Sequence, residues 1–196
     1  MAIMCYGDSL TAGFCKGGRE YWPYAEVLED RLHRPVPFYA VSGWTAEEML
    51  RHQDNPECRD VAGLLAPGLG VVLQRESEAP ETFSDTGESS RLRVVLLLAG
   101  TNDLADVTND IDASVHRIVE NIWGLHTLCH EAGLRTMCIG IPAGRHQTQD
   151  MSAVRATVNV MLSGRCRATP HADYVPFPIA YSRTNELWDA DGLHLS

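Results

Sequence analysis

Five residues with the groups needed for acyl transfer stand in polar turns of this 196-residue chain, most of them directly after an apolar run: Ser9, Gly43, Asn102, Asp191 and His194. A serine hydroxyl becomes a useful nucleophile when a neighbouring base accepts its proton. Histidine suits that task because its ordinary pKa is about 6.5. A serine after a strand is more often a helix N-cap. The other four residues are the reason to interpret Ser9 as a nucleophile.

Each of these residues could fill one role of a serine hydrolase. Ser9, in the segment GDSL, would attack a carbonyl carbon while His194 accepts its proton. Asp191 precedes His194 by three residues and could bond the second ring nitrogen, which would fix the tautomer. The backbone N–H groups of Ser9 and Gly43 and the side-chain amide of Asn102 could converge on the developing oxyanion.

The elements that must position these residues can be read from the hydrophobic pattern. Short apolar runs typical of buried strands cover 2–6, 36–43, 93–100, 135–142 and 172–180. Helical patterns cover 20–33, 44–52, 110–133 and 152–164, and Thr45 with Glu48 forms a predicted capping box. The alternation predicts an α/β fold with a parallel sheet and helices on both faces, whose strand ends share one edge.

Four sequence blocks resemble those of the GDSL esterase/lipase family, also called SGNH hydrolases. The blocks are GDSLTAG (7–13), SGWTA (42–46), GTND (100–103) and DGLH (191–194), in the order of that family. The resemblance implies a three-layer α/β/α, flavodoxin-like parallel sheet and ester hydrolysis through an acyl-enzyme on Ser9. It implies that Asp191 and His194 complete the triad and that Gly43 and Asn102 assist at the oxyanion. It also implies that neither a metal nor an organic cofactor is needed.

Four further residues are candidates for the rim of the site. Asp8 is expected to organise the turn before Ser9 rather than to react. Trp44 could shape an acyl or alcohol pocket, or could equally be a packing residue. Arg145 and His146 follow the fourth predicted strand and could line the substrate.

A metal pair is the main alternative that the histidines offer. His126 and His130 are four residues apart on one predicted helix, a spacing compatible with two ligands. The residues between them lack the glutamate that a zinc protease helix uses, so the sequence favours no metal site here.

Composition limits the classes of partner. A formal net charge of -10 argues against nucleic-acid binding through a basic patch, and no apolar run reaches the roughly 18 residues of a membrane span. The six cysteines are scattered, without a Cys-x-x-Cys pair, and are expected to be reduced. With no signal-peptide pattern before Ser9, a cytoplasmic protein is expected. The oligomeric state stays open.

A single domain over 1–196 is expected from the length. Within it, the acidic stretch 74–91 is interpreted as a polar insertion. The sequence ends two residues after His194, without the closing C-terminal helix typical of the family. We therefore expect the segment that carries His194 to fray unless other residues hold it. We also expect apolar surface to stay uncovered where a final helix would pack.

The leading hypothesis is a serine esterase that acts on small-molecule esters with small to medium acyl groups. One alternative is a catalytically impaired relative that binds without turnover. Another is an acyltransferase that uses the same triad with an alcohol as the acceptor.

Overall fold

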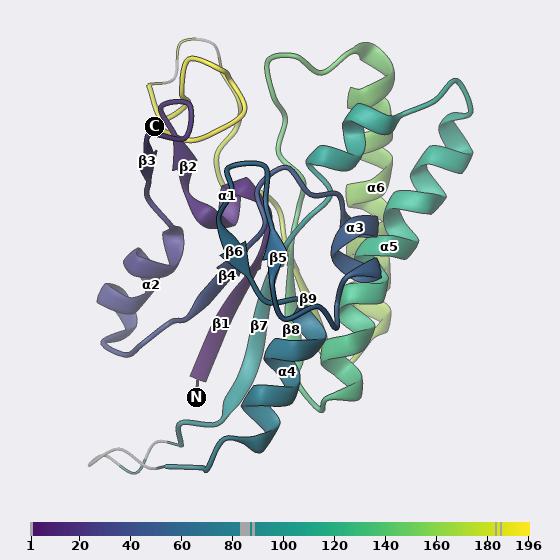
Figure 1. Ribbon diagram of the computed structural model, residues 1–196. Helices are drawn as coiled ribbons and strands as arrows, with labels where there is room; N and C mark the ends of the chain where they lie inside the picture. Colours follow the sequence, from purple (N-terminus) through teal and green to yellow (C-terminus); the bar gives the residue numbers. More distant parts are fainter. Residues whose placement is uncertain (1, 83–86, 88, 183, 185) are drawn as a thin grey trace.

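A computed structural model describes residues 2–82, 87, 89–182, 184 and 186–196. Its centre is a five-stranded parallel sheet in the order β4-β1-β7-β8-β9 (Figure 1). These strands are β1 (Ala2–Gly7), β4 (Phe38–Ala40), β7 (Leu92–Leu98), β8 (Arg135–Ile139) and β9 (Ala172–Val175). Numbered among themselves, they follow the order 2-1-3-4-5, which is the flavodoxin-like arrangement.

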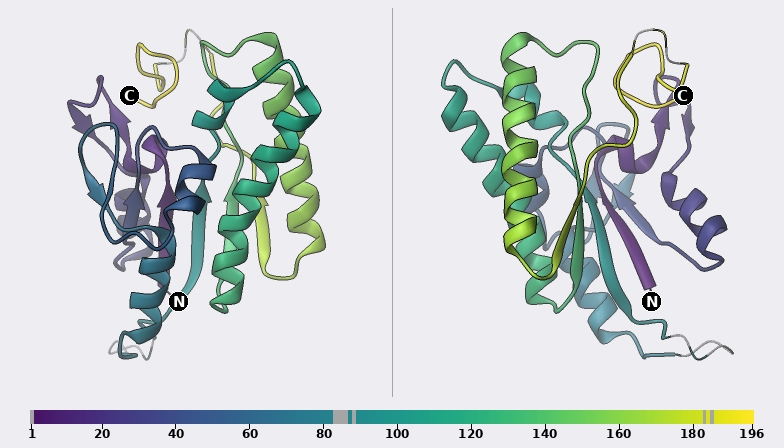
Figure 2. Two further views of the ribbon diagram at one scale, coloured as in Figure 1. Left: turned by 45° about the vertical axis from the view of Figure 1, so that its right-hand side comes forward. Right: turned by 180° about the vertical axis from the view of Figure 1, so that it is seen from behind.

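Helices cover both faces of the sheet and give three layers (Figure 2). One face carries α2 (Tyr24–Leu32). The other carries α3 (Ala46–Arg51), α4 (Leu69–Glu78), α5 (Ile111–Glu131) and α6 (Gln149–Ala168). The predicted α/β class, with its parallel sheet and flavodoxin-like layers, is therefore confirmed.

The core is unequally divided between the two faces. Successive strand residues point to opposite sides of a sheet, and β1 shows this directly. Met4 and Tyr6 enter the large cluster under α3 to α6, whereas Cys5 enters a smaller cluster with Ala25 of α2. The sheet is thus buried on both sides, which explains why its strands read as continuous apolar runs.

Several predicted boundaries need correction. The helix expected within 20–33, entered at Trp22, begins at Tyr24, because Glu20–Tyr21 is strand β3 and Pro23 is the N-cap. Strand β4 is shorter than the predicted run 36–43, since Pro37 precedes it and a turn follows it. Helix α6 extends past the predicted 152–164 at both ends, from a capping box at Thr148.

The stretch 74–91, interpreted as a polar insertion, begins inside a helix. Residues 74–78 form the second half of α4, whose Leu69, Val72 and Leu73 are buried in the main core. The acidic residues there are the solvent face of an amphipathic helix. Residues 83–86 and 88 of the same stretch lie outside the described part of the chain.

Short elements stand at the carboxyl edge of the sheet. Helix α1 (Ser9–Ala12) follows β1, and the 3₁₀ helix η1 (Asn102–Asp106) follows β7. Two small antiparallel hairpins that the sequence did not predict join β2 (Phe14–Cys15) to β3 (Glu20–Tyr21) and β5 (Cys58–Arg59) to β6 (Leu65–Ala66). Among the described residues after β9, none is helical.

All six cysteines lie in the described part of the chain, are buried, and form no disulfide, as expected. Of the helices the structure describes, none combines the length and the apolarity needed to cross a membrane.

Candidate active site

Ser9 lies at the turn between β1 and α1, at the carboxyl edge of the sheet. A Cβ on Gly7 would stand 2.1 Å from the carbonyl oxygen of Leu98, so only glycine lets β1 end this close to β7. Asp8 then caps α1, its Oδ1 accepting the N–H of Leu10 at 3.0 Å. Ser9 is the first helical residue, where the helix dipole favours negative charge.

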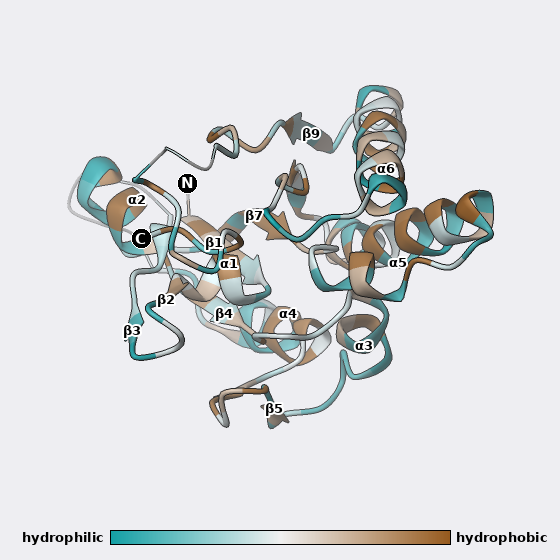
Figure 3. Ribbon diagram, turned by 90° about the horizontal axis from the view of Figure 1, so that it is seen from above, coloured by the Kyte–Doolittle hydropathy of each residue, from teal (hydrophilic) through white to brown (hydrophobic). Residues whose placement is uncertain are grey.

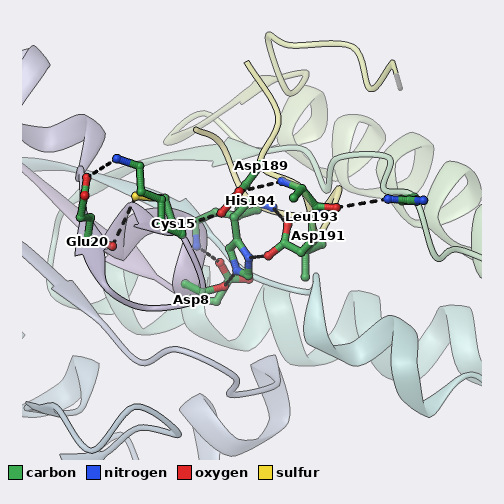
Figure 4. A network of polar contacts seen from close by, with 12 residues as sticks. Asp8, Cys15, Glu20, Asp189, Asp191, Leu193 and His194 are labelled. Atoms are coloured by element: carbon green, nitrogen blue, oxygen red, sulfur yellow. Dashed lines mark hydrogen bonds and ion pairs between the residues drawn. The ribbon is translucent and has the colours of Figure 1, made fainter. Parts of the chain in front are cut away.

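A chain of hydrogen bonds joins Ser9 to residues near the other end of the sequence. The Ser9 Oγ lies 2.8 Å from Nε2 of His194, and Nδ1 of His194 lies 2.7 Å from Oδ2 of Asp191. Figure 4 shows the His194 ring between Asp191 and the turn that carries Asp8. The order hydroxyl, imidazole, carboxylate is the arrangement that activates a serine.

Asp191 is held as an anion by its own loop. Partial burial opposes its ionisation, but the ring of His194 and the N–H groups of His194 and Leu193 outweigh burial and lower the pKa of this carboxyl. Its Oδ1 accepts those two N–H groups at 3.0 and 2.9 Å. A carboxylate fixed in this way orients the imidazole and stabilises an imidazolium.

The loop that carries Asp191 and His194 is tied down on two sides. Asp189 accepts the backbone N–H of Lys16, from the segment after α1, and donates its own N–H to the carbonyl of His194 at 2.8 Å. Arg145 donates its backbone N–H to Gly192 at 2.8 Å and its guanidinium to Ala190 at 3.2 Å. These bonds, visible in part in Figure 4, oppose the fraying that the sequence predicted.

The reacting groups are sheltered from water. Ser9 and His194 keep 6% and 8% of their surface exposed. The ring of Phe14, from hairpin β2–β3, covers the imidazole with the two ring centroids 4.6 Å apart. A partly desolvated site strengthens the hydrogen bonds within it.

The three N–H donors that the sequence nominates for oxyanion binding differ in the partners that they have in the structure. Among the described residues, no acceptor bonds the backbone N–H of Ser9 or of Gly43. The amide of Asn102 donates one hydrogen to the carbonyl of Trp44 at 2.9 Å. That bond fixes Asn102 beside the Trp44–Thr45 peptide and leaves the second amide hydrogen for a ligand.

The turn that carries Gly43 is organised by Asp60, which the sequence did not single out. The Oδ2 of Asp60 accepts the N–H of Ser42 at 3.2 Å, and its Oδ1 accepts the N–H groups of Ala62 and Leu64 at 2.9 and 2.8 Å. Gly43 itself has φ +80°, in the left-handed region that favours glycine. A contact between residues 18 positions apart leaves no local signal that could have revealed Asp60.

Two buried carboxyls lie behind the site and resist ionisation. Burial raises the pKa of Asp8 to about 6, although the bond from Leu10 favours the anion. Burial likewise raises the pKa of Asp103 to about 6, and its Oδ2 accepts the N–H of Ala46 at 2.8 Å. Asp103 therefore links η1 to the start of α3, behind the Gly43 turn.

Comparison with known proteins agrees with this geometry. The sequence profile described as the GDSL-like Lipase/Acylhydrolase family matches residues 5–196. The chain belongs to that family. A search of curated proteins finds no match.

Solved structures of esterases and lipases have the same fold as this family member. TesA is 16% identical, with a TM-score of 0.67 over 100% of this chain and 89% of its own. A lipase from a goat rumen metagenome is 15% identical, with a TM-score of 0.66 over 100% and 90%. The psychrotrophic esterase EstA from Pseudoalteromonas sp., in a structure inhibited by monoethylphosphonate, is 17% identical, with a TM-score of 0.63 over 100% and 87%. At these identities the likeness shows the fold.

Three candidate rim residues of this acylhydrolase-family chain remain: Trp44, Arg145 and His146. The half-buried Trp44 donates its Nε1–H to Arg59 at 3.2 Å, and its ring stands edge-on to His52, which indicates packing. Arg145 supports the His194 loop and lines a hollow of about 210 Å³ with Gly192. His146 is exposed next to it.

The histidine pair that resembled a metal site has another partner. The hydroxyl of Thr136 lies 2.7 Å from Nδ1 of His126 and 2.9 Å from Nε2 of His130. Thr136 is the second residue of β8, so this cluster lies toward the edge opposite Ser9. In the described part of the chain, no three His, Cys, Asp or Glu side chains are grouped as metal ligands.

Proposed function

We propose that this protein is a serine esterase that hydrolyses carboxylic esters with small to medium acyl groups through an acyl-enzyme on Ser9. Membership of the GDSL-like lipase/acylhydrolase family supports hydrolysis in general terms. The observation that carries the finer proposal is the continuous chain from Ser9 through His194 to Asp191, with contacts of 2.8 and 2.7 Å.

Acylation would begin with attack of the Ser9 Oγ on the ester carbonyl carbon. As the new C–O bond forms, the hydroxyl proton passes to Nε2 of His194, while Asp191 stabilises the imidazolium through Nδ1. Collapse of the tetrahedral intermediate breaks the bond to the alkoxy oxygen, which receives the proton from His194 and departs as an alcohol.

Deacylation would repeat the sequence with water as the nucleophile. His194 accepts a proton from water, the hydroxide oxygen bonds the acyl carbon, and the bond to Ser9 Oγ breaks as the serine regains its proton. The carboxylic acid leaves, and the enzyme returns to its starting state.

Negative charge on the carbonyl oxygen would be stabilised by three N–H donors. The free N–H groups of Ser9 and Gly43 and the second amide hydrogen of Asn102 support this assignment. Loss of one such donor typically slows an acyl transfer by about 10²- to 10³-fold.

Hydrolysis of p-nitrophenyl acetate and butyrate by the wild type and by Ser9→Ala tests the proposal. We expect at least about a 10⁴-fold loss of kcat/KM in Ser9→Ala. Ser163→Ala, which changes a serine near the C-terminal end of α6 and so toward the opposite edge of the sheet, is the matched control and should act as the wild type. Equal rates for the wild type and Ser9→Ala would refute the esterase assignment.

Covalent labelling separates the esterase from its alternatives. A fluorophosphonate probe should add to Ser9 in the wild type and leave Ser9→Ala unlabelled. A well-folded wild type that neither reacts with the probe nor turns over would favour a binding protein. Acyl transfer to added alcohols in preference to water, followed by product analysis, would favour an acyltransferase.

We propose a reducing compartment, such as the cytoplasm, as the place where the protein works. The support is that all six cysteines are buried and free of disulfide bonds in the folded chain.

A further inference from the structure

A cluster of apolar side chains stays in solvent on the hairpin formed by β5 and β6. Val61, Leu64 and Leu65 are 75%, 49% and 53% exposed. Figure 3 shows this hairpin as a brown segment beside the label β5. Single exposed apolar residues are ordinary, but three within five positions form a patch, and such patches mark binding surfaces.

The patch is continuous with the candidate oxyanion turn. Val61 donates its N–H to the carbonyl of Ser42 at 3.2 Å. Its two γ carbons would lie only 2.6 and 2.7 Å from a Cβ built on Gly43, so the valine side chain covers the Cα of that glycine. An ester oxygen held by the Gly43 N–H at about 2.9 Å would bring the carbon chain attached to its carbonyl within reach of Val61.

The hairpin is both rigid and free of exposed negative charge. Asp60 is the only carboxylate within residues 58–66; it is buried and accepts three backbone N–H groups. The guanidinium of Arg59 bonds the carbonyl of Gly63 at 3.1 Å. On a chain with a formal net charge of -10, this surface is suited to an uncharged hydrocarbon group.

From these observations we infer that Val61, Leu64 and Leu65 form the wall against which the acyl chain of the substrate lies, and that they set a preference for hydrophobic acyl groups. The inference rests on the proposed esterase function, and it adds the class of substrate. Residues 58–66 would therefore both position Gly43 and contact the acyl chain.

A chain-length series with one leaving group tests this directly. The substrates are p-nitrophenyl acetate, butyrate, hexanoate and octanoate, kept below their critical micelle concentrations. The hairpin variant carries Val61→Thr, Leu64→Thr and Leu65→Thr. The matched control carries Val27→Thr and Val160→Thr, at valines that are 61% and 68% exposed on α2 and α6.

In the wild type, kcat/KM should rise with each methylene that reaches the wall, by at most about fourfold per CH₂. In the hairpin variant, the ratio of octanoate to acetate kcat/KM should fall about tenfold or more relative to the wild type, since contacts to several methylenes are removed. The control variant should match the wild type on all four esters. Retained acetate turnover also shows that the hairpin variant is folded.

Three results would count against the inference, and they can be told apart. An unchanged octanoate-to-acetate ratio in an active hairpin variant overturns the acyl wall alone. If the ratio is unchanged for the dissolved esters but the hairpin variant loses activity when the same esters are presented in vesicles, the patch is assigned to a lipid surface and the acyl wall is overturned as well. Absence of Ser9-dependent hydrolysis of every ester overturns the proposed function, and the inference with it.

Discussion

Two places in this molecule join an imidazole to a hydroxyl at nearly the same distance. At the carboxyl edge of the sheet, Nε2 of His194 lies 2.8 Å from Ser9 Oγ. Toward the opposite edge, Nδ1 of His126 lies 2.7 Å from Thr136 Oγ1, which also contacts His130. The contact itself is the same in both places, so other features must distinguish a candidate catalytic pair from a structural one.

The second ring nitrogen makes the difference. In His194 it faces the carboxylate of Asp191, which can stabilise a protonated ring. In His126 the second nitrogen, Nε2, is buried and has no partner among the described residues. Burial, with a contribution from His130, lowers the pKa of His126 to about 3. A base must hold the proton that it takes, which the facing carboxylate of Asp191 favours and which the burial of His126 opposes.

Removing the carboxylate should make the first pair resemble the second. Asp191→Asn keeps the size of the side chain. Its neutral amide forms a different hydrogen bond with Nδ1 of His194 and cannot stabilise the imidazolium. We expect kcat/KM at pH 7 to fall about 10³- to 10⁴-fold, measured with p-nitrophenyl butyrate. Asp173→Asn, at an exposed carboxylate of β9, is the matched control and should retain activity. A loss below about tenfold in Asp191→Asn would contradict the role assigned to Asp191.

Lowering the pH should reduce the free energy of unfolding, because His126 is buried in its neutral form. Its ordinary pKa of 6.5 is lowered to about 3 in the folded chain, so the unfolded chain binds a proton between these values and the folded chain does not. The stability that this creates is present above pH 6.5 and is lost as the pH falls toward 3. Between pH 7 and 4.5, the wild type should lose about 2–3 kcal/mol more unfolding free energy than His126→Gln.

Urea unfolding at the two pH values measures this difference. Asp8 and Asp103, whose carboxyl pKa values are raised to about 6, act in the opposite direction, because the folded chain keeps their protons as the pH rises from 4 to 6. They are present in both proteins and cancel in the comparison. His146→Gln makes the same change at an exposed position and should stay within about 0.5 kcal/mol of the wild type. An equal acid response in the wild type and His126→Gln would count against the argument.

Deleting the second hydroxyl should change stability and not activity. Thr136→Val keeps the branched shape that suits β8 but leaves Nδ1 of His126 and Nε2 of His130 without their partner. We expect the free energy of unfolding to fall by about 1–3 kcal/mol, with kcat/KM for p-nitrophenyl butyrate within about twofold of the wild type. A loss of activity comparable to that of Ser9→Ala would show that the two clusters are not functionally distinct.

The smallest effect is expected where the backbone alone can support the catalytic loop. Arg145→Ala removes the guanidinium bond to Ala190 but keeps the backbone bond to Gly192. A net hydrogen bond is worth about 0.5–1.5 kcal/mol, so kcat/KM should fall about two- to tenfold. Arg135→Ala, which removes an exposed ion pair near the opposite edge, should leave kcat/KM unchanged. An equal loss in both variants would indicate a general effect of charge instead.

Local patterns predicted the framework well. The aliphatic run 93–100 is β7 in its greater part, the Thr45–Glu48 capping box is present, and α5 stops just before Gly133, whose φ is +76°. These features depend on neighbours a few residues apart, where periodicity and capping act. The five candidate residues were recognised from their four blocks, and the structure brings Ser9, Asp191 and His194 together.

Features that depend on distant contacts were not predictable. Two-residue strands such as β5 and β6 have little propensity of their own, and the bond from Ser42 to Asp60 that joins their hairpin to the Gly43 turn spans 18 positions. The bond from Lys16 to Asp189 spans 173 positions, so no window of sequence contains both partners. Helix α4 was missed altogether, because its buried leucines come first and the acidic face that follows was interpreted as a separate insertion.

The separation between Ser9 and His194 has a consequence for the life of the chain. The two residues are 185 positions apart, yet their side chains share one hydrogen bond. A ribosome that makes this protein therefore completes β1, α1 and nearly every helix before it adds His194. Between the addition of Ser9 and that of His194, the growing chain carries the serine without the imidazole that would activate it.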